Sequence, residues 1–130
     1  MHRIACDRGR GMKEITKTLS ALADPTRLRL LRLLYGQELC VCELMEAVQL
    51  PQYKVSRHLL ELRRIGLAES TRSGRWMHYR ISRAAMRSPL AQDLLKVLDV
   101  HLRELPEAKR DDARLAKRLV AGRADRYACS

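Results

Sequence analysis

The chain has 130 residues, of which 46% are hydrophobic and 4% aromatic, a composition that excludes a disordered chain and suits one small helical domain. Lys and Arg outnumber Asp and Glu by 26 to 15, and the resulting net charge of +11 favours a polyanionic partner such as nucleic acid over a merely solvated basic surface. The sequence has no secretory signal and no membrane-spanning apolar run, so we expect a cytoplasmic protein with reduced thiols and no membrane partner.

The beginning of the chain predicts an arm followed by two helices. Residues 1–12 contain glycines and no apolar period, which indicates an extended N-terminal arm. A helix is predicted over 13–22. Asp24 then suits the N-cap and Pro25 the first position of a second helix, which ends at Gly36.

Two short helices and a hairpin follow. The helix over 40–48 is separated by a break at Pro51 from a helix over 52–65, whose apolar residues recur at helical spacing. Two helices joined by a tight turn form a helix-turn-helix unit. Strands are predicted over 67–72 and 75–81, with a Ser-Gly turn between them. The predicted fold class is therefore mainly α with one β-hairpin, a winged helix-turn-helix.

The next predicted helix carries a stripe of leucines: Leu90, Leu94, Leu98, Leu102 and Leu105. This stripe is too apolar for a lone surface helix, so we expect it to pack across the interface of a homodimer, with burial in the core of one chain as the alternative. The domain with its dimerisation helices thus extends over 13–105. Residues 106–130 are expected to form a charged C-terminal tail.

The helix over 52–65 has a polar side opposite its apolar stripe, and this side is the candidate surface for reading double-stranded DNA. Gln can pair with adenine edges, and Arg with guanine edges or phosphate, while cations on the hairpin would contact the DNA backbone. The alternative is a solvated polar face. The candidate DNA-binding residues are Gln52, Lys54, Ser56, Arg57 and His58 on the helix and Arg72 and Arg75 on the hairpin.

Four segments within about residues 13–105 resemble the ArsR/SmtB family of metal-sensing repressors, in order and at family-like spacing. They are ADPTR at 23–27, ELCVCEL at 38–44, SRHL at 56–59 and RWMHY at 75–79. The resemblance implies a homodimer that represses an operator and releases it when a toxic metal or metalloid binds. The ELCVCEL segment is the most specific, and it implies induction by trivalent arsenic or antimony.

The chain departs from the family's patterns at two sites. Arsenic-sensing members with a third cysteine on the same helix carry it where this chain has Met45. Members with a cadmium or lead site bring cysteines from an N-terminal arm, and here the arm offers Cys6. Asp99 and His101 match the start of the family's zinc site, but its second ligand pair is missing. We therefore interpret Asp99 and His101 as structural or surface residues.

Cys40 and Cys42 flank one valine, and their thiolates are soft ligands that suit trivalent arsenic as well as cadmium, lead and zinc. Residues i and i+2 of a regular helix point about 200° apart, so both would reach one ion only if the first helical turn opens. That opening would disturb the neighbouring reading helix. Trivalent arsenic needs three thiolates, and Cys6 is the expected third, whereas Cys129 is expected to stay unligated.

Other functions compete with this one. A repressor that responds to cadmium, lead or zinc would use the same thiols with a fourth ligand. A thiol-oxidation sensor fits less well, because a disulfide between such near neighbours is strained. In a different class, a thiol-based metal carrier would have no need of the hairpin, the positive charge or the polar helix face. No nucleophile–base pair, phosphate loop or complete catalytic metal site is present, so we expect neither an enzyme nor a cofactor for DNA binding.

Overall fold

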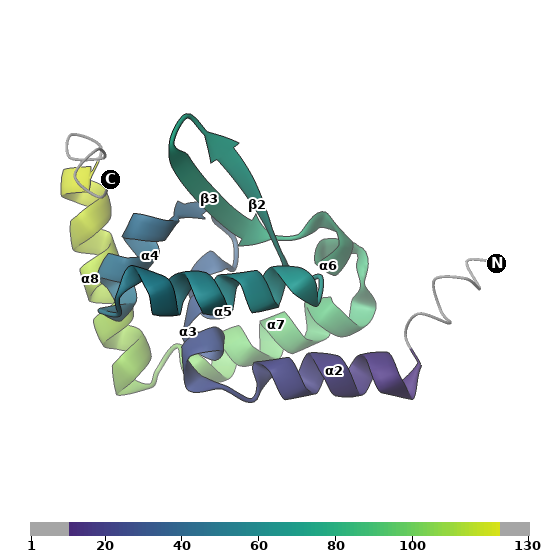
Figure 1. Cartoon of the computed structure of the whole chain (residues 1–130). Coiled ribbons are helices and arrows are strands. Elements are labelled where there is room, and N and C mark those ends of the chain that lie inside the picture. Colours follow the sequence, from purple (N-terminus) through teal and green to yellow (C-terminus); the bar gives the residue numbers. More distant parts are fainter. Residues whose placement is uncertain (1–10, 123–130) are drawn as a thin grey trace.

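The computed structural model describes residues 11–122, and Figure 1 shows how they are arranged. The elements in chain order are α2 (Met12–Leu22), α3 (Pro25–Leu34), β1 (Leu39–Cys40), α4 (Val41–Val48), α5 (Gln52–Arg64), β2 (Ala68–Ser73), β3 (Trp76–Ile81), α6 (Arg83–Arg87), α7 (Pro89–Leu102) and α8 (Pro106–Gly122). The hairpin of β2 and β3 projects from the helical body (Figure 1). The mainly helical fold with a hairpin is therefore confirmed.

The sheet has one strand more than predicted. Its order is β1-β3-β2, and β1 pairs antiparallel with β3 so that Cys40 lies opposite His78. The helix predicted over 40–48 accordingly begins at Val41, because Cys40 is still extended. The short strand thus ties the start of α4 directly to the hairpin.

The centre of the domain is α3, which contacts five other helices and β3. It begins where predicted, because the Asp24 carboxylate accepts hydrogen bonds from the N–H groups of Thr26 and Arg27 at 2.9 and 3.1 Å, and Pro25 occupies the first turn. The leucines of α3 that are at most 1% exposed are Leu30, Leu31, Leu33 and Leu34. Burial of each such side chain contributes about 1.5–3 kcal/mol, so α3 anchors the elements around it.

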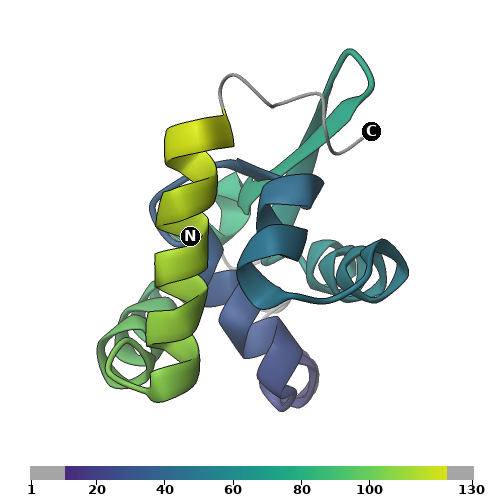
Figure 2. The same cartoon turned by 90° about the vertical axis from the view of Figure 1, so that its left-hand side faces the viewer.

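The expectation of a charged tail after residue 105 needs correction, because residues 106–122 form α8. In Figure 2 this yellow-green helix stands beside the blue α4, which it contacts along its length. Ala108 and Leu115 of α8 are buried, and between them Asp111 is 0% exposed. A carboxylate in the apolar face obscured the helical pattern in the sequence. Its burial depends on Arg29 of α3, which donates two hydrogen bonds of 2.8 Å to it.

The leucines that form the predicted stripe are partly buried along α7, so the stripe lies at the edge of the core. Leu94 and Leu98 are partly buried and pack against the core, whereas Val97 beside them is 54% exposed. The helix therefore borders the core of its own chain and also leaves an apolar edge uncovered. Within residues 11–122, every helix is too short or too polar to span a lipid bilayer.

Candidate functional site

The helices α4 and α5 form the predicted helix-turn-helix unit. Gln49 ends α4 in the left-handed region, with φ 57°, and its N–H donates to the Met45 carbonyl at 2.8 Å. The Pro51 carbonyl accepts hydrogen bonds from Lys54 and Val55 and so starts α5. This turn fixes the position of α5, which lies in front of α3 in Figure 1.

The N-terminal half of α5 carries most of the predicted reading residues to the surface. Those that are exposed or half-buried are Gln52, Lys54, Ser56 and Arg57. Tyr53, which is not among the predicted reading residues, is 67% exposed beside them. It precedes the buried Val55 by two positions, and this spacing on a helix places the two side chains on opposite sides. This two-residue spacing could have indicated from the sequence alone that Tyr53 is exposed.

The expectation that His58 faces solvent is wrong, because the residue is 9% exposed. It follows Val55 by three residues and shares the inward side of α5. Its Nδ1 accepts a hydrogen bond of 3.1 Å from Nε of Arg27, which also donates to the Ala21 carbonyl at 3.2 Å. Burial lowers the pKa of His58, which keeps the imidazole neutral and able to accept this bond. His58 therefore joins α5 to α3.

The tip of the hairpin is basic, as predicted. Arg72 and Arg75 are both exposed, and Gly74 between them has φ 63°, a conformation that glycine adopts without strain. The guanidinium carbon of Arg75 lies 5.4 Å from the centre of the Trp76 ring. A contact of this kind is worth about 0.5–1 kcal/mol at an exposed site, and it orients the arginine without neutralising it.

The sulfur atoms of Cys40 and Cys42 lie 2.9 Å apart, and the two residues are 3% and 6% exposed. The assumption of a regular helix through both cysteines was wrong. Cys40 ends β1 with φ −83° and ψ 162° and is the N-cap of α4, while Cys42 lies in the first helical turn. The extended residue turns its sulfur toward its neighbour, so the turn does not have to open for the two thiols to converge.

Cys40 and Cys42, whose sulfurs are both thiols in the reduced protein and are here called the thiol pair, contact α4, the sheet and α8. Glu43 accepts a hydrogen bond of 2.9 Å from the Cys40 N–H and completes a capping box. Burial raises the pKa of the Cys40 thiol. On the other side, Nη2 of Arg118 in α8 donates to the Cys42 sulfur at 3.6 Å. A change at these sulfurs therefore acts on three elements at once.

The thiol pair supplies two soft ligands, and the others must come from elsewhere. Cys6 and Cys129 lie outside the described residues. Within residues 11–122, no three side chains of His, Cys, Asp or Glu are grouped so that they could hold a metal ion. Two buried, converging sulfurs fit a thiophilic ion that a further thiol completes.

Residues 24–70 match the family described as "Bacterial regulatory protein, arsR family". An uncharacterized HTH-type transcriptional regulator of Methanocaldococcus jannaschii is 33% identical over 70 residues, which are 53% of this chain and 79% of that protein. The chain belongs to the arsR family. Arsenic resistance transcriptional regulator ArsR1 of Pseudomonas putida is 44% identical over 77 residues, or 56% of this chain. The match spans 60% of the length of that relative.

The arsR-family fold also matches solved structures. The homodimeric winged helix-turn-helix DNA-binding domain of a Mycobacterium bovis protein aligns with a TM-score of 0.60 at 27% identity, over 76% of this chain and 91% of that one. The predicted winged helix-turn-helix is thereby confirmed. The family and its relatives are transcriptional regulators and not enzymes, in agreement with the expectation from the sequence.

The positions of the zinc site known in the arsR family make other contacts here. Asp99 accepts a hydrogen bond of 2.8 Å from Arg103, and His101 is exposed on α7. Asp112 on α8 forms an ion pair of 2.6 Å with Arg32. Asp99 thus has an ion-pair partner in Arg103, and the structural or surface role of Asp99 and His101 stays a prediction.

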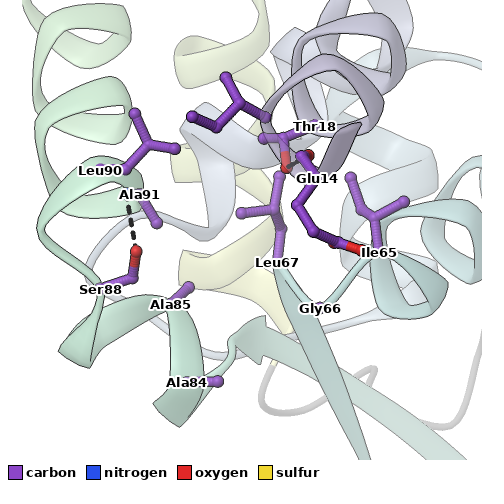
Figure 3. Close-up of a pocket in the computed structure, with 11 residues that line it drawn as sticks. Glu14, Thr18, Ile65, Gly66, Leu67, Ala84, Ala85, Ser88, Leu90 and Ala91 are labelled. Carbon is purple, nitrogen blue, oxygen red and sulfur yellow. Dashed lines mark hydrogen bonds between the residues drawn. The ribbon is translucent and has the colours of Figure 1, made fainter. Parts of the chain in front are cut away.

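An apolar groove of about 330 Å³ lies between α2 and the start of α7 (Figure 3). Its lining includes Ile15 of α2, Leu67 at the base of the hairpin, and Leu90 and Ala91 of α7. The Ser88 hydroxyl at its edge is already engaged, since it accepts a hydrogen bond from the Ala91 N–H at 3.2 Å. The groove thus offers apolar surface beside α7, the helix for which the sequence predicts a dimer interface.

Proposed function

We propose that this arsR-family protein is a transcriptional repressor that binds operator DNA as a homodimer and releases it when trivalent arsenic or antimony binds Cys40 and Cys42. The observation that carries the proposal is the buried contact of 2.9 Å between these two sulfurs at the start of α4. The helix that holds them braces α5, which exposes the reading residues. The name of the Pseudomonas putida relative, an arsenic resistance regulator, supports the choice of ion.

DNA recognition is assigned to the exposed half of α5 and to the hairpin tip. Gln52 would pair with an adenine edge and Arg57 with a guanine edge or a phosphate, because these side chains match the donors and acceptors of the major groove. Ser56 and Lys54 would contact phosphates. Tyr53 adds an exposed aromatic surface for a thymine methyl group or a sugar. The residues assigned to the DNA backbone on the hairpin are Arg72 and Arg75.

Ligand binding is assigned to the thiol pair together with a third thiol, for which Cys6 is our choice. With arsenite, each As–S bond replaces an As–OH bond, and the thiol proton leaves with the hydroxide as water. No oxidation or reduction takes place, so binding is reversible and suits a sensor. A cadmium, lead or zinc ion would use the same two sulfurs, and comparison of these ions decides between them.

Release of the operator follows from a movement that ligation requires. Binding of one ion by both sulfurs fixes the distance between them, which is now 2.9 Å, at the value that the two bonds to the ion require. Cys40 lies in the strand opposite His78, and Cys42 lies in the first turn of α4. A change in this distance would therefore shift the junction of the hairpin and the helix-turn-helix, and with it the spacing of the two DNA-contacting surfaces.

The homodimer is proposed from the uncovered apolar edges of α2 and α7. Leu19 of α2 and Val97 and Val100 of α7 are 49%, 54% and 49% exposed. Exposed aliphatic residues on two helices that also line an apolar groove are typical of a subunit interface. Two copies related by a twofold axis would present two reading helices to two half-sites.

The test is a titration of the protein bound to DNA from upstream of its own gene, followed by fluorescence anisotropy. We expect arsenite and antimonite to release the DNA from the reduced protein at lower concentrations than cadmium, lead or zinc. Release by a divalent ion alone would replace the arsenic assignment with the cadmium, lead or zinc alternative. Failure to bind any such DNA, together with tight binding of these ions, would favour a metal carrier.

A further inference from the structure

The helix α8 runs antiparallel along α4 and contacts both of its ends (Figure 2). Arg118, late in α8, contacts Cys42 at the start of α4, while Arg114 donates to the Ala47 carbonyl near the end of α4 at 2.8 Å. One helix therefore spans the distance from the thiol pair to the turn of the helix-turn-helix.

The contact at the turn is a buried ionic cluster, here called the Asp111 cluster and made of Asp111, Arg29 and Arg114. The carboxylate of Asp111 is 0% exposed and accepts hydrogen bonds from Arg29 at 2.8 Å and from Arg114 at 2.9 Å. Arg29 also donates to the Val48 carbonyl at 3.0 Å. The cluster thus holds the last carbonyls of α4, directly before the turn that positions α5.

The contact of α8 with the thiol pair is weaker than the Asp111 cluster, and the guanidinium group that makes it, that of Arg118, is only partly hydrogen-bonded. Nη2 of Arg118 donates to the Cys42 sulfur at 3.6 Å, whereas its Nε is buried and has no hydrogen-bond partner among the described residues. Leu119, the next residue, lines a cavity of about 350 Å³ that reaches Cys40. This end of α8 therefore has a buried cation next to the thiols and room in which to move.

We propose that α8 is a sensor helix, in which Arg118 responds to the state of the Cys42 sulfur and the Asp111 cluster passes the response to the turn of the helix-turn-helix. The inference rests on the proposed function, because it takes the thiol pair to be the inducer site. It adds a second route from the thiol pair to the DNA-contacting surfaces, besides the one through β1 and the hairpin.

The physical reason is that ligation removes the partner of Arg118. A sulfur that gives a lone pair to an ion accepts a weaker hydrogen bond, and a change in the distance between the two sulfurs would move Cys42 relative to α8. Because a helix is stiff along its axis, a displacement at Arg118 is carried to Arg114 and Asp111. The carbonyls of Ala47 and Val48 then lose well-aligned donors, and the end of α4 is free to shift.

The experiment compares the parent with Arg118→Met and Arg114→Met, which break the two ends of the route. Lys117→Met is the matched control, since Lys117 is exposed on the same helix. For each reduced protein, arsenite is added while three signals are measured: thiolate-to-arsenic ultraviolet absorption, amide hydrogen exchange of α8, and release of labelled operator. Arg118→Lys keeps a cation at this position and serves as the conservative variant.

When arsenite is added to the parent, we expect the thiolate-to-arsenic absorption to appear, amide hydrogen exchange in α8 to become faster and the operator to be released, all over the same range of concentration. In Arg118→Met and Arg114→Met we expect the absorption to persist while release needs about tenfold more arsenite, a change within the usual range of coupling between two sites. Arg118→Lys should recover part of the response, and Lys117→Met should match the parent. Thermal unfolding of each variant shows whether it is folded.

Two results would overturn the inference. Release by Arg118→Met at the parent's arsenite concentration, with normal absorption, would refute the sensor helix and leave the thiol site intact. Amide hydrogen exchange in α8 of the parent that stays unchanged while the operator is released would also refute the sensor helix. Absence of arsenic absorption in the parent would instead refute the thiol site itself, and the sensor helix with it.

Discussion

Arg27 and His58 join α3 to α5 through a hydrogen bond of 3.1 Å from Nε of the arginine to Nδ1 of the histidine. The acceptor must be a neutral imidazole, and burial lowers the pKa of His58 accordingly. The helix that carries the reading residues is therefore fixed to the core by a contact that protonation breaks.

We expect the free energy of unfolding to decrease as the pH falls below about 6.5, the usual pKa of histidine. The folded state has the lower pKa at His58, so the unfolded state binds the proton more readily and is favoured. The contribution is complete above the unfolded-state pKa and is lost as the pH falls through the folded-state value. Urea unfolding at several pH values between about 8 and 5 measures this dependence.

His58→Asn provides the control for this dependence. Asparagine does not titrate, and its carbonyl oxygen can still accept the hydrogen bond from Arg27. The pH dependence of the variant should therefore be shallower than that of the parent in this range. Parallel curves for the two proteins would assign the titration to another group.

We expect Gln52→Ala and Arg57→Ala each to weaken operator binding by about 1–3 kcal/mol, because each removes a contact to a base edge. Both side chains are exposed, so the thermal unfolding of the variants should match the parent. Arg75→Ala should weaken binding to all DNA sequences by a similar factor. It should also lower the slope of log affinity against log salt concentration by about one, as loss of a phosphate contact does. Arg110→Ala, on the exposed side of α8, removes the same charge elsewhere and should have a smaller effect. Parent-like affinity in all three test variants would mean that another helix enters the groove.

We expect Val97→Glu to convert the dimer into monomers and to weaken operator binding. Val97 is 54% exposed on α7, so a charge there disturbs the proposed interface and spares the core of the chain. Val120→Glu makes the same change at an 86% exposed residue of α8 and should remain dimeric. Sedimentation velocity distinguishes the two states, and an intact dimer in Val97→Glu would exclude this edge of α7 from the interface.

We expect Cys40→Ser and Cys42→Ser to bind the operator like the parent and to lose its release by arsenite. Serine is a preferred N-cap, so replacing Cys40 leaves the start of α4 intact while it removes a soft ligand. Cys6→Ser should lose most of the arsenite-driven release of the operator, and Cys129→Ser should release it like the parent. Anisotropy titrations of the reduced variants with arsenite measure this, and normal release by either of the first two would refute the thiol switch. Normal release by Cys6→Ser alone would move the third ligand to Cys129 or to an external thiol.

We expect Asp111→Asn to lower the free energy of unfolding by about 3 kcal/mol, because it leaves two arginines at a buried site without their carboxylate. This value is at the low end of the usual range of about 3–5 kcal/mol for breaking a buried ion pair. The reason is that the side chains of Arg29 and Arg114 are still 27% and 31% exposed, so water stabilises part of their charge. Glu104→Gln is the matched control: the side chains of Glu104 and of its partner Lys109 are 75% and 63% exposed, so this change should cost less than about 1 kcal/mol. Equal effects in denaturant unfolding would mean that α8 is not an integral part of the domain.

Much of the fold could be predicted because its signals are local. The N-cap at Asp24, the apolar period of α5 and the alternation in β3 each act within a few residues of the chain, and each element formed where it was expected. The candidate reading residues on the exposed half of α5 follow from that same period. Capping and periodicity require no knowledge of distant partners.

The tertiary structure decided what depends on distant partners. His58 is buried because Arg27, 31 residues away, can donate to it. The segment after residue 105 forms α8 because Arg29, 82 residues before Asp111, satisfies a carboxylate that would otherwise be too costly to bury. By itself the sequence determined which residues could bind soft ions and DNA. The packing of α8 and the sheet around Cys40 determined that the two sulfurs converge, because a pairing partner in β3 keeps that residue extended.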